Sequence, residues 1–317
     1  MIVVLAGGVG GARMAHGLQQ VLPPGHLTAV VNVADDFTHY GLHISPDLDT
    51  VMYTLGGIAD PVNGWGVAGD TRQTLDAISR YGRNPWFLLG DQDFATHILR
   101  TERLRNGATL SEATVELTAA LGIESAILPV TDDPVATLVQ THDGWLDFQD
   151  YFVGRRQADD VVGVRFEGIE RAQAGSAVLQ AITDAAVVVI APSNPIVSVA
   201  PILQTPGVVE ALSRRTAPVV AVSPIIGGKA LKGPAANMLR TLGHDVSALG
   251  VARIYGTVID GLVIDNADAA LAPEIEALGH PVLATNAIMG DATDRARFAD
   301  EVLEFAGSLA REQAAAR

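Results

Sequence analysis

Cysteine is absent from this 317-residue sequence. Its absence excludes disulfides, thiolate nucleophiles and cysteine-ligated zinc or iron–sulfur sites, so any catalysis must use oxygen and nitrogen groups. Basic residues are scarce as well, because 21 Lys and Arg stand against 36 Asp and Glu and leave a formal charge of −15. Nucleic acids and anionic membranes need a surface rich in lysine and arginine, so the composition predicts neither as a partner. A charged ligand must therefore be small and held by a local site.

Long apolar runs are also missing. The longest, residues 185–191 (AAVVVIA), is far shorter than a membrane span, and the first residues (MIVVLAGG) show no basic segment of a secretion signal. These features predict a cytoplasmic protein without membrane contact. The chain shows no internal repeats, and its length suits one large domain or a domain with a smaller companion.

Short β-branched runs alternate with helical patterns along most of the chain, and each run ends in a loop rich in glycine, proline or aspartate. This alternation predicts an α/β fold with a mostly parallel, Rossmann-like sheet and helices on both faces. Ligands of such sheets bind at the carboxyl ends of the strands. The loops after the strands are therefore where functional residues are expected.

Two interior segments follow other patterns. Helical spacing over residues 70–125 predicts a helical insert. Residues 126–170 predict a small antiparallel β segment, with a hairpin turn at Asp143-Gly144. The nucleotide-binding core then comprises residues 1–69 and 171–317.

A glycine-rich stretch, GGVGGAR, follows the first predicted strand. Four glycines in five positions let backbone N–H groups approach an anion, and the helix expected over residues 12–21 adds the partial positive charge of its N-terminus. The spacing matches neither the Walker A motif nor G-x-G-x-x-G. A tight turn that needs positive φ is the alternative reading. We favour phosphate binding, and the candidate residues are Gly7, Gly8, Gly10, Gly11 and Arg13.

Four carboxylates follow the second predicted strand within fifteen residues: Asp35, Asp36, Asp47 and Asp49. Like charges beside a phosphate site repel one another and the phosphate unless a cation lies between them. Oxygen ligands next to a phosphate indicate Mg²⁺, so all four are candidate metal ligands. Asp47 follows Pro46 and could instead cap a helix, and Asp35 and Asp36 could be solvated loop acids.

Two later loops offer further polar groups. Ser193 and Asn194 follow a buried strand and could bind phosphate or a small acid, although an Asx or proline turn would use the same residues. Lys229 and Lys232 are the only lysines of the sequence. An ammonium group suits a diphosphate, but exposed loop lysines are common, so both readings stay open.

Eight segments, taken in order, resemble the 2-phospho-L-lactate transferase family of coenzyme F420 biosynthesis. They are AGGVGGAR, NVADDF, LHISPDLDTVMYTL, LGDQDFATHILRT, LPVTDDPV, FQDYFVG, APSNPIVSVAPIL and SPIIGGKALKGPAANML. The resemblance implies a transferase that moves a phosphate ester of a three-carbon acid from a guanosine-diphosphate-linked donor to the ribityl hydroxyl of the deazaflavin Fo. GMP leaves, and a homodimer is the family-like expectation.

The resemblance also implies site residues. It places Asp49 near Fo, and Leu88 aligns with a second position that contacts Fo. Asp47 and Thr50 are neighbours of Asp49 in the same motif. The reaction needs positioning, charge neutralisation and one proton acceptor, for which Asp49 and Asp36 are the candidates. Whether Asp49 is the base or a metal ligand stays open.

Several alternatives remain at this stage. His97 and Arg100 lie three apart on one helical face, which fits helix packing as well as a ligand role. A non-catalytic regulator that binds nucleotide sugars would share the glycine stretch, and a dinucleotide-dependent oxidoreductase would use Asp35 or Asp36 on a ribose. The donor is either lactyl or enolpyruvyl. The arginine- and alanine-rich, lysine-poor composition resembles actinobacterial members and favours enolpyruvyl.

Overall fold

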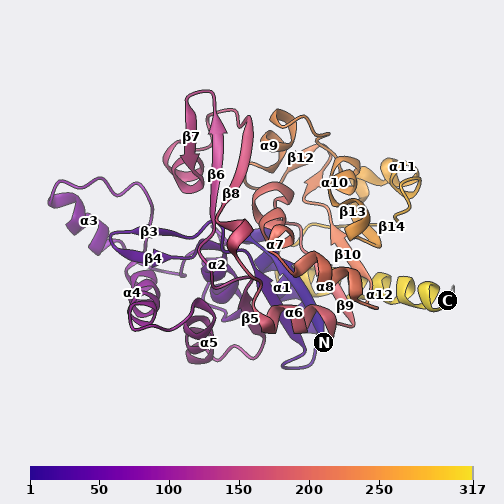
Figure 1. Ribbon diagram of the computed structural model, residues 1–317, viewed down its shortest axis with the longest axis horizontal. Coiled ribbons are helices and arrows are strands. Elements are labelled where there is room, and N and C mark those ends of the chain that lie inside the picture. Colours follow the sequence, from indigo (N-terminus) through magenta and orange to yellow (C-terminus); the bar gives the residue numbers. More distant parts are fainter. Residues whose placement is uncertain (316–317) are drawn as a thin grey trace.

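The computed structural model describes residues 1–315. Its centre is a seven-stranded sheet in which every neighbouring pair is parallel, in the order β14-β13-β10-β9-β1-β2-β5 (Figure 1). The strands are β1 (Ile2–Ala6), β2 (Leu27–Val31), β5 (Ala126–Pro129), β9 (Val187–Ile190), β10 (Val219–Val222), β13 (Gly261–Asp265) and β14 (Val282–Thr285). β2, β9, β10 and β13 are buried at every residue, as expected for strands covered on both faces. The predicted α/β class is confirmed.

The strand order places a switch point between β1 and β9. The chain leaves β1 for β2 on one side, and the strand on the other side of β1 comes much later, with Ile2 opposite Val187. Connections on the two sides of such a point run in opposite directions, which opens a crevice at the carboxyl ends of the two strands. The loops that follow β1 and β9 therefore face each other.

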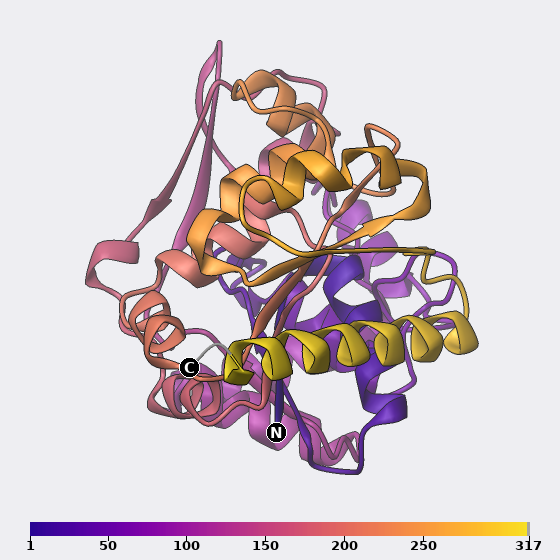
Figure 2. The same cartoon turned by 90° about the vertical axis from the view of Figure 1, so that its right-hand side faces the viewer.

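Helices pack around this sheet in groups. α12 crosses the molecule in front of the sheet in Figure 2 and packs against α1 and the strands β9, β10 and β13. α1 also packs against α2, and α8 packs against both α6 and α7. The helices are α1 (Gly8–Val21), α2 (Pro46–Leu55), α6 (Ser176–Thr183), α7 (Ala200–Gln204), α8 (Val208–Arg214), α9 (Ala235–Thr241), α10 (Ala248–Tyr255), α11 (Ala272–Glu276) and α12 (Ala292–Ala315).

The segment from residue 70 to 125 is helical, as its spacing predicts. It contains α3 (Gln73–Arg80), α4 (Asp91–Arg105) and α5 (Leu110–Ala120). A capping box starts α5, in which the Thr109 hydroxyl accepts from the Glu112 N–H and the Glu112 carboxylate accepts from the Thr109 N–H. Two short strands, β3 (Phe37–His39) and β4 (Leu42–Ile44), pair beside α4.

The small antiparallel sheet has the order β7-β6-β8, with β6 (Ala136–Thr141), β7 (Gly144–Asp147) and β8 (Gly163–Glu167). The expected hairpin is present, but its turn is one residue earlier than predicted: Thr141 pairs with Gly144, so His142 and Asp143 form the turn. β5 differs from the expectation for residues 126–170, because it joins the main sheet beside β2 instead of lying over it. Its Ile127 is buried in the main core, which explains the difference. The division of the chain into a core and two inserts stays a prediction.

Shorter elements complete the described chain: β11 (Ile225–Ile226), β12 (Lys229–Ala230), η1 (Asp150–Gly154), η2 (Ile169–Arg171), η3 (Pro195–Val199), η4 (Gly256–Val258) and η5 (Asn266–Leu271). Among residues 1–315, no single helix has the length and apolar composition of a membrane span. One bent pair, Pro195–Gln204 with Val208–Arg214, meets those two criteria only when its members are taken together.

Candidate functional site

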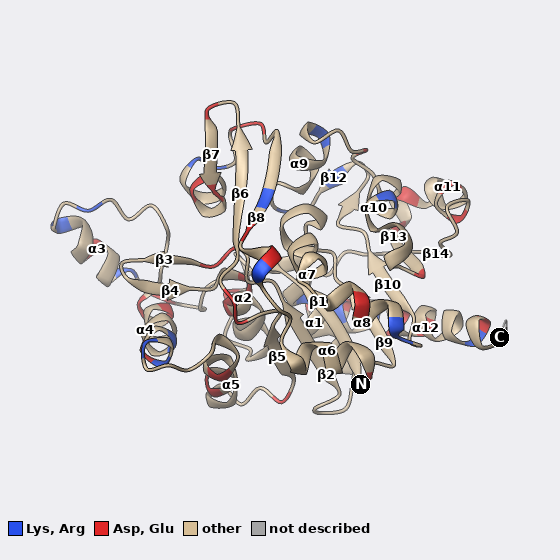
Figure 3. Ribbon diagram, in the orientation of Figure 1, with Lys and Arg blue, Asp and Glu red and all other residues tan. Residues whose placement is uncertain are grey.

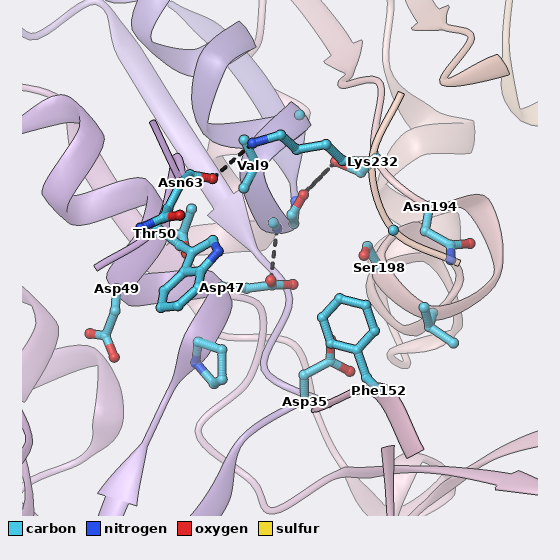
Figure 4. A pocket seen from close by; sticks show the side chains of 18 of the residues that line it. Val9, Asp35, Asp47, Asp49, Thr50, Asn63, Phe152, Asn194, Ser198 and Lys232 are labelled. Carbon is cyan, nitrogen blue, oxygen red and sulfur yellow. Dashed lines mark hydrogen bonds between the residues drawn. The ribbon is translucent and has the colours of Figure 1, made fainter. Parts of the chain in front are cut away.

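A cavity of about 650 Å³ lies at the carboxyl ends of β1 and β9, at the switch point of the sheet. Figure 4 shows its lining side chains converging from several parts of the chain. The volume is in the range of small-molecule sites. The lining segments include the turn after β1, the start of α2, residues 62–66 and 87–89, the start of α4, the region of η1, the loop after β9, and residues 223–235 and 287–289; Asp35 lines the cavity as well.

The glycine stretch is the first turn of α1 and not a separate loop. The helix begins at Gly8, earlier than the predicted start, with Gly7 as an extended N-cap at φ −152°. Gly8 has φ +59°, a left-handed conformation that a side chain disfavours. Both residues face Asp47, since a Cβ at Gly7 would lie 2.7 Å from Asp47 Oδ2.

The other two glycines allow close packing. A Cβ at Gly10 would lie 2.2 Å from the Pro192 carbonyl oxygen, and one at Gly11 would lie 2.9 Å from the Ala6 Cβ. These contacts bring the start of α1 against β1 and the loop after β9. The stretch therefore meets two demands. Gly8 supplies the positive φ of a tight turn at the α1 N-terminus, where an anion can bind, and Gly10 and Gly11 allow the close packing.

Asp47 caps α1 and not its own helix α2. Its Oδ1 accepts a 2.7 Å hydrogen bond from the Gly8 N–H, and its Oδ2 accepts a 3.0 Å bond from Asn32. The partial positive charge of the α1 N-terminus favours an anion there. Burial nevertheless raises the pKa of Asp47 to about 6, against the lowering effect of the Asn32 and Gly8 hydrogen bonds. Asn32 was not anticipated from the sequence.

Asp35 lies in the same cavity as Asp47. Burial, followed by the negative charge of Asp47, raises the pKa of Asp35 well above its ordinary value. Its Oδ1 is buried and has no hydrogen-bond partner among the described residues. A cation between the two carboxylates would remove both the repulsion and the unsatisfied oxygen, so this pair fits Mg²⁺.

The other two acids lie apart from this pair. Asp36 accepts a 2.7 Å hydrogen bond from the Ser45 hydroxyl, lies 3.0 Å from His43 Nε2, and is not part of the cavity wall. Asp49 lines the cavity but points away from Asp47 in Figure 4. Within residues 1–315, no group of three or more acidic or histidine side chains surrounds one metal-sized point.

Asp49 is paired with Arg100. Two nitrogens of the guanidinium donate to the two Asp49 oxygens, and His97 Nδ1 lies 3.6 Å from Asp49 Oδ2. Burial lowers the pKa of Arg100, but the Asp49 charge and hydrogen bond outweigh it and leave the pKa raised. His97 and Arg100 are thus buried in the packing between α4 and α2, and both also contact the candidate site residue Asp49.

Aromatic and apolar groups form much of the remaining wall. Leu88 lines the cavity and is 38% exposed, and Thr50 lines it from α2. Phe148 and Phe152 stack with centroids 5.4 Å apart and an interplanar angle of 6°. Trp65 faces the same space. The sequence analysis did not single out these three rings, because a single aromatic residue carries no local pattern that separates a binding role from ordinary packing.

Ser193 and Asn194 both line the cavity, and both are already hydrogen-bonded. The Ser193 hydroxyl donates to the Gly7 carbonyl at 2.8 Å and accepts from the Gly7 N–H at 3.2 Å. Asn194 Oδ1 accepts from the Ile196 N–H at 2.9 Å, which is the Asx turn considered from the sequence. Ser193 therefore ties the loop after β9 to the turn after β1.

Cations gather at the start of α1 although acidic residues predominate and the two signs are interspersed over the chain (Figure 3). Arg13 and Lys232 line the cavity, and Arg13 Nε is buried without a hydrogen-bond partner among residues 1–315. Burial and the charge of Arg13 lower the pKa of Lys232. The same two causes lower the pKa of Arg295 on α12, a residue that the sequence did not indicate. Lys229 is exposed on β12 outside the cavity wall.

Comparisons with known proteins agree with this geometry. The sequence profile of the family described as 2-phospho-L-lactate transferase CofD matches residues 2–289. A 2-phospho-L-lactate transferase from Methanosarcina acetivorans is 40% identical over 308 residues, covering 97% of this chain and 98% of the relative. A phosphoenolpyruvate transferase from Streptomyces griseus is 42% identical over 311 residues, covering 96% and 98%.

The fold also has a solved counterpart. A crystal structure of a UPF0052-family protein from Bacillus halodurans matches with a TM-score of 0.61 and 16% identity, covering 95% of this chain and 98% of that one. At this identity the match shows the fold alone. The full-length similarity to transferases favours an enzyme over a non-catalytic regulator or an oxidoreductase.

Proposed function

The chain belongs to the 2-phospho-L-lactate transferase CofD family of coenzyme F420 biosynthesis, and from that premise we propose its reaction. A phosphoenolpyruvyl or 2-phospho-L-lactyl group moves from a guanosine-diphosphate-linked donor to the ribityl hydroxyl of the deazaflavin Fo, and GMP leaves. The observation that supports this most directly is the Asp35–Asp47 pair at the N-terminus of α1, inside a cavity with aromatic walls. Such a cavity suits a diphosphate beside ring systems.

Asp35 and Asp47 would hold Mg²⁺, with donor phosphate oxygens and water as further ligands. Bound there, the ion would neutralise charge on the diphosphate. Asp47 is oriented for this role by Asn32 and the Gly8 N–H. Asp36 is held by Ser45 and His43 behind the cavity wall, so it would act on the loop and not on substrate.

Arg13 and Lys232 would bind the phosphate oxygens that the α1 N-terminus leaves free. Arg13 Nε is buried without a partner among the described residues, which is costly unless an anion binds. Lys232 donates to the Asn63 carbonyl at 2.8 Å, so its ammonium is already held over the cavity. Gly7, Gly8, Gly10 and Gly11 would shape the turn, and Ser193 and Asn194 would hold the facing loop. Lys229 is exposed outside the cavity wall, so it would not bind the donor.

The acceptor would occupy the part of the cavity near Asp49, Thr50 and Leu88. Asp49 would accept a hydrogen bond from it, and Leu88 would contact its ring through apolar atoms. Phe148 and Phe152 offer a second flat surface for a ring system. Two aromatic ligands would thus meet with the diphosphate between them.

Product analysis tests this proposal. Purified protein, Fo, Mg²⁺ and each synthetic donor should give GMP and a product whose mass equals Fo plus the transferred group. No product with either donor would overturn the transferase proposal for this chain.

Donor preference is a separate prediction. Relatives named for the two donors are 40% and 42% identical, so identity does not decide between them. Lysine-poor composition leads us to expect a higher kcat/KM with the enolpyruvyl donor. A difference at one carbon changes binding in an apolar pocket by only about 1–3 kcal/mol, so the lactyl donor should still react measurably. A tenfold lactyl preference in side-by-side kinetics would contradict the donor assignment alone.

A homodimer is part of the proposal as well. Light scattering after size exclusion should then give about twice the 33.1 kDa mass of the chain. A mass of one chain at working concentration would contradict it.

A further inference from the structure

Three polar residues on one face of α4 are buried next to the cavity, and two of them, Asp93 and His97, also line it. Asp93, His97 and Arg100 follow the i, i+4, i+7 spacing of a helical face, and their exposed fractions are 8%, 1% and 1%. They face Asp49 and Tyr53 of α2, which are themselves buried. Two helices from different parts of the chain thus share a row of polar side chains where apolar packing would be ordinary.

Arg100 holds Asp49 by both oxygens. One guanidinium nitrogen donates to Asp49 Oδ1, and the other donates to Oδ2 at 3.2 Å. This two-pronged geometry fixes the plane of the carboxylate, which a single donor would not do. A carboxylate oxygen has two lone-pair sites, so one site on each oxygen remains for a ligand in the cavity.

A chain of contacts holds Arg100 and His97 in turn. Arg100 lies 3.4 Å from His97 Nδ1, and His97 Nε2 lies 3.1 Å from Asp93 Oδ1. The Tyr53 hydroxyl donates to the same Asp93 oxygen at 2.6 Å. A guanidinium can only donate, so the Arg100 contact makes Nδ1 the acceptor and places the hydrogen of a neutral His97 on Nε2, which lies beside Asp93. The row Tyr53–Asp93–His97–Arg100 ends on Asp49.

We propose that Arg100, held by His97 and Asp93, is a positioning residue that fixes Asp49 as a hydrogen-bond acceptor for the alcohol substrate. Arg100 already donates to both Asp49 oxygens, so Asp49 orients the hydroxyl, whose proton leaves on the phosphate of the departing GMP as the new P–O bond forms. The adjacent positive charge also disfavours a divalent cation at Asp49. This inference rests on the proposed function, because it assigns the part of that reaction that Asp49 performs.

The burial of the pair supports a role in binding and not only in stability. A buried ion pair loses in desolvation much of what it gains in attraction, so it is a weak stabiliser. Arg103 on the same helix is the contrast: it pairs with Glu116 across the surface, with exposed fractions of 44% and 52%. Arg103→Met is therefore the matched control for Arg100.

Steady-state kinetics of Arg100→Lys test the proposal, because lysine keeps the charge but not the two-pronged geometry. We expect the KM for Fo to rise about tenfold or more, as a charged hydrogen bond is lost, while kcat changes less than about threefold and the donor KM is unchanged. His97→Gln should move the same parameters less. Arg103→Met should leave all three within about twofold, the scatter of surface changes.

A double-mutant cycle shows whether Arg100 acts through Asp49. In an Asp49→Asn background, Arg100→Met should change the KM for Fo less than about twofold, because the residue it positions is already gone. Loss of thermal stability with an unchanged KM for Fo would indicate a structural role and overturn the proposal. If Arg100→Met does not fold, Arg100→Lys decides alone.

Direct binding of Fo, measured by fluorescence titration, separates this inference from the proposed function. Wild-type turnover with an unchanged KM for Fo in Arg100→Lys overturns the positioning role only. Wild-type binding of Fo without product overturns the reaction, and weaker binding by Arg100→Lys would still support the positioning role. No binding of Fo by the wild type overturns both.

Discussion

Glycine at the start of α1 meets two separate physical demands. Gly8 adopts φ +59°, whereas Gly10 leaves no room for a Cβ beside the Pro192 carbonyl. Only the demand at Gly8 concerns the backbone conformation; the demand at Gly10 concerns space. Substitutions at the two positions should therefore fail for different reasons, strain at Gly8 and overpacking at Gly10.

Gly10→Ala should lower the free energy of unfolding by about 1–3 kcal/mol, since the new methyl group would push α1 away from the loop after β9. It should also weaken GDP binding, because the α1 N-terminus moves with it. Denaturant unfolding and calorimetry measure the two effects. Gly307→Ala is the control within a helix, where the added Cβ meets only the Arg311 side chain at 3.5 Å, and it should stabilise by about 0.5–1 kcal/mol. Unchanged GDP affinity in folded Gly10→Ala would place the nucleotide elsewhere.

Asp47 and Asp35 make magnesium binding depend on pH. The folded pKa of Asp47, about 6, lies above the ordinary value for aspartate. A raised folded pKa contributes stability that is present below the unfolded pKa and is lost as pH rises through the folded one. The metal-free protein therefore loses this contribution between about pH 4 and 7.

Mg²⁺ competes with protons for these carboxylates, so its effect on the melting temperature should be larger at pH 7.5 than at pH 5. Thermal unfolding at both pH values, with and without Mg²⁺, measures this. Asp35→Asn should remove most of the shift, and Asp36→Asn should retain it. An equal Mg²⁺ effect at both pH values, or its loss in Asp36→Asn alone, would contradict the assignment of the ligands.

At the scale of elements, α3 and α4 cap each other. Asp70, before α3, accepts hydrogen bonds from the Gln92 and Asp93 N–H groups at the start of α4. Asp91, in α4, accepts from the Gln73 and Thr74 N–H groups at the start of α3. Each helix start is thus satisfied by a carboxylate from the other, which couples the two starts.

Asp70→Ala should cost about 1 kcal/mol of unfolding free energy, the usual effect of a lost cap. Because the same residue holds the Asp93 N–H, amide exchange in the first turn of α4 should also become faster. Asp76→Ala, on the first turn of α3, is the comparison variant and should lack the exchange effect. Equal exchange in the two variants would count against the coupling of α3 and α4.

The sequence predicted an element correctly where the residues of that element alone determine it. Pro46 begins α2, and the periods of the β-branched runs gave the parallel strands. The start of α1 was placed too late, because its cap, Asp47, comes from 39 residues away. β5 was assigned to the wrong sheet, since which edge a short apolar strand joins is decided by packing and not by its own residues.

The same limit holds for the site. Sequence alone brought Asp35, Asp47, Asp49, Arg13 and Lys232 to attention, and all five line the cavity. It did not separate the Asp35–Asp47 pair from Asp49, because Arg100 meets Asp49 from another helix. Long-range pairing of this kind has no local signature.

Across the whole molecule, one contact joins loops that are 169 residues apart. Lys232 Nζ donates to the Asn63 carbonyl over the cavity, and a Cβ at Gly64 would lie 2.7 Å from the Val9 side chain. The loop around Asn63 therefore rests on the start of α1 and is tied to the loop of Lys232. Both would need to part for a nucleotide to enter or leave.

Lys232→Met should raise the KM for the donor about tenfold, because it removes a phosphate contact and the tie to Asn63 together. Lys229→Met is the matched control, as it removes the other lysine from outside the cavity, and should stay within about twofold. Kinetics with varied donor at saturating Fo measure both. Equal effects of the two substitutions would indicate a general charge effect and contradict a contact specific to Lys232.

The pairing of β1 with β9 also governs how the protein is made. β1 leaves the ribosome well before its neighbour β9, which begins at residue 187, so one edge of β1 stays unpaired while about 180 further residues are synthesised. At ordinary rates this takes on the order of ten to forty seconds. An unpaired apolar edge is a template for misassociation, and the nucleotide site cannot exist before β9 closes it. The nascent chain should thus depend on chaperones until its second half emerges.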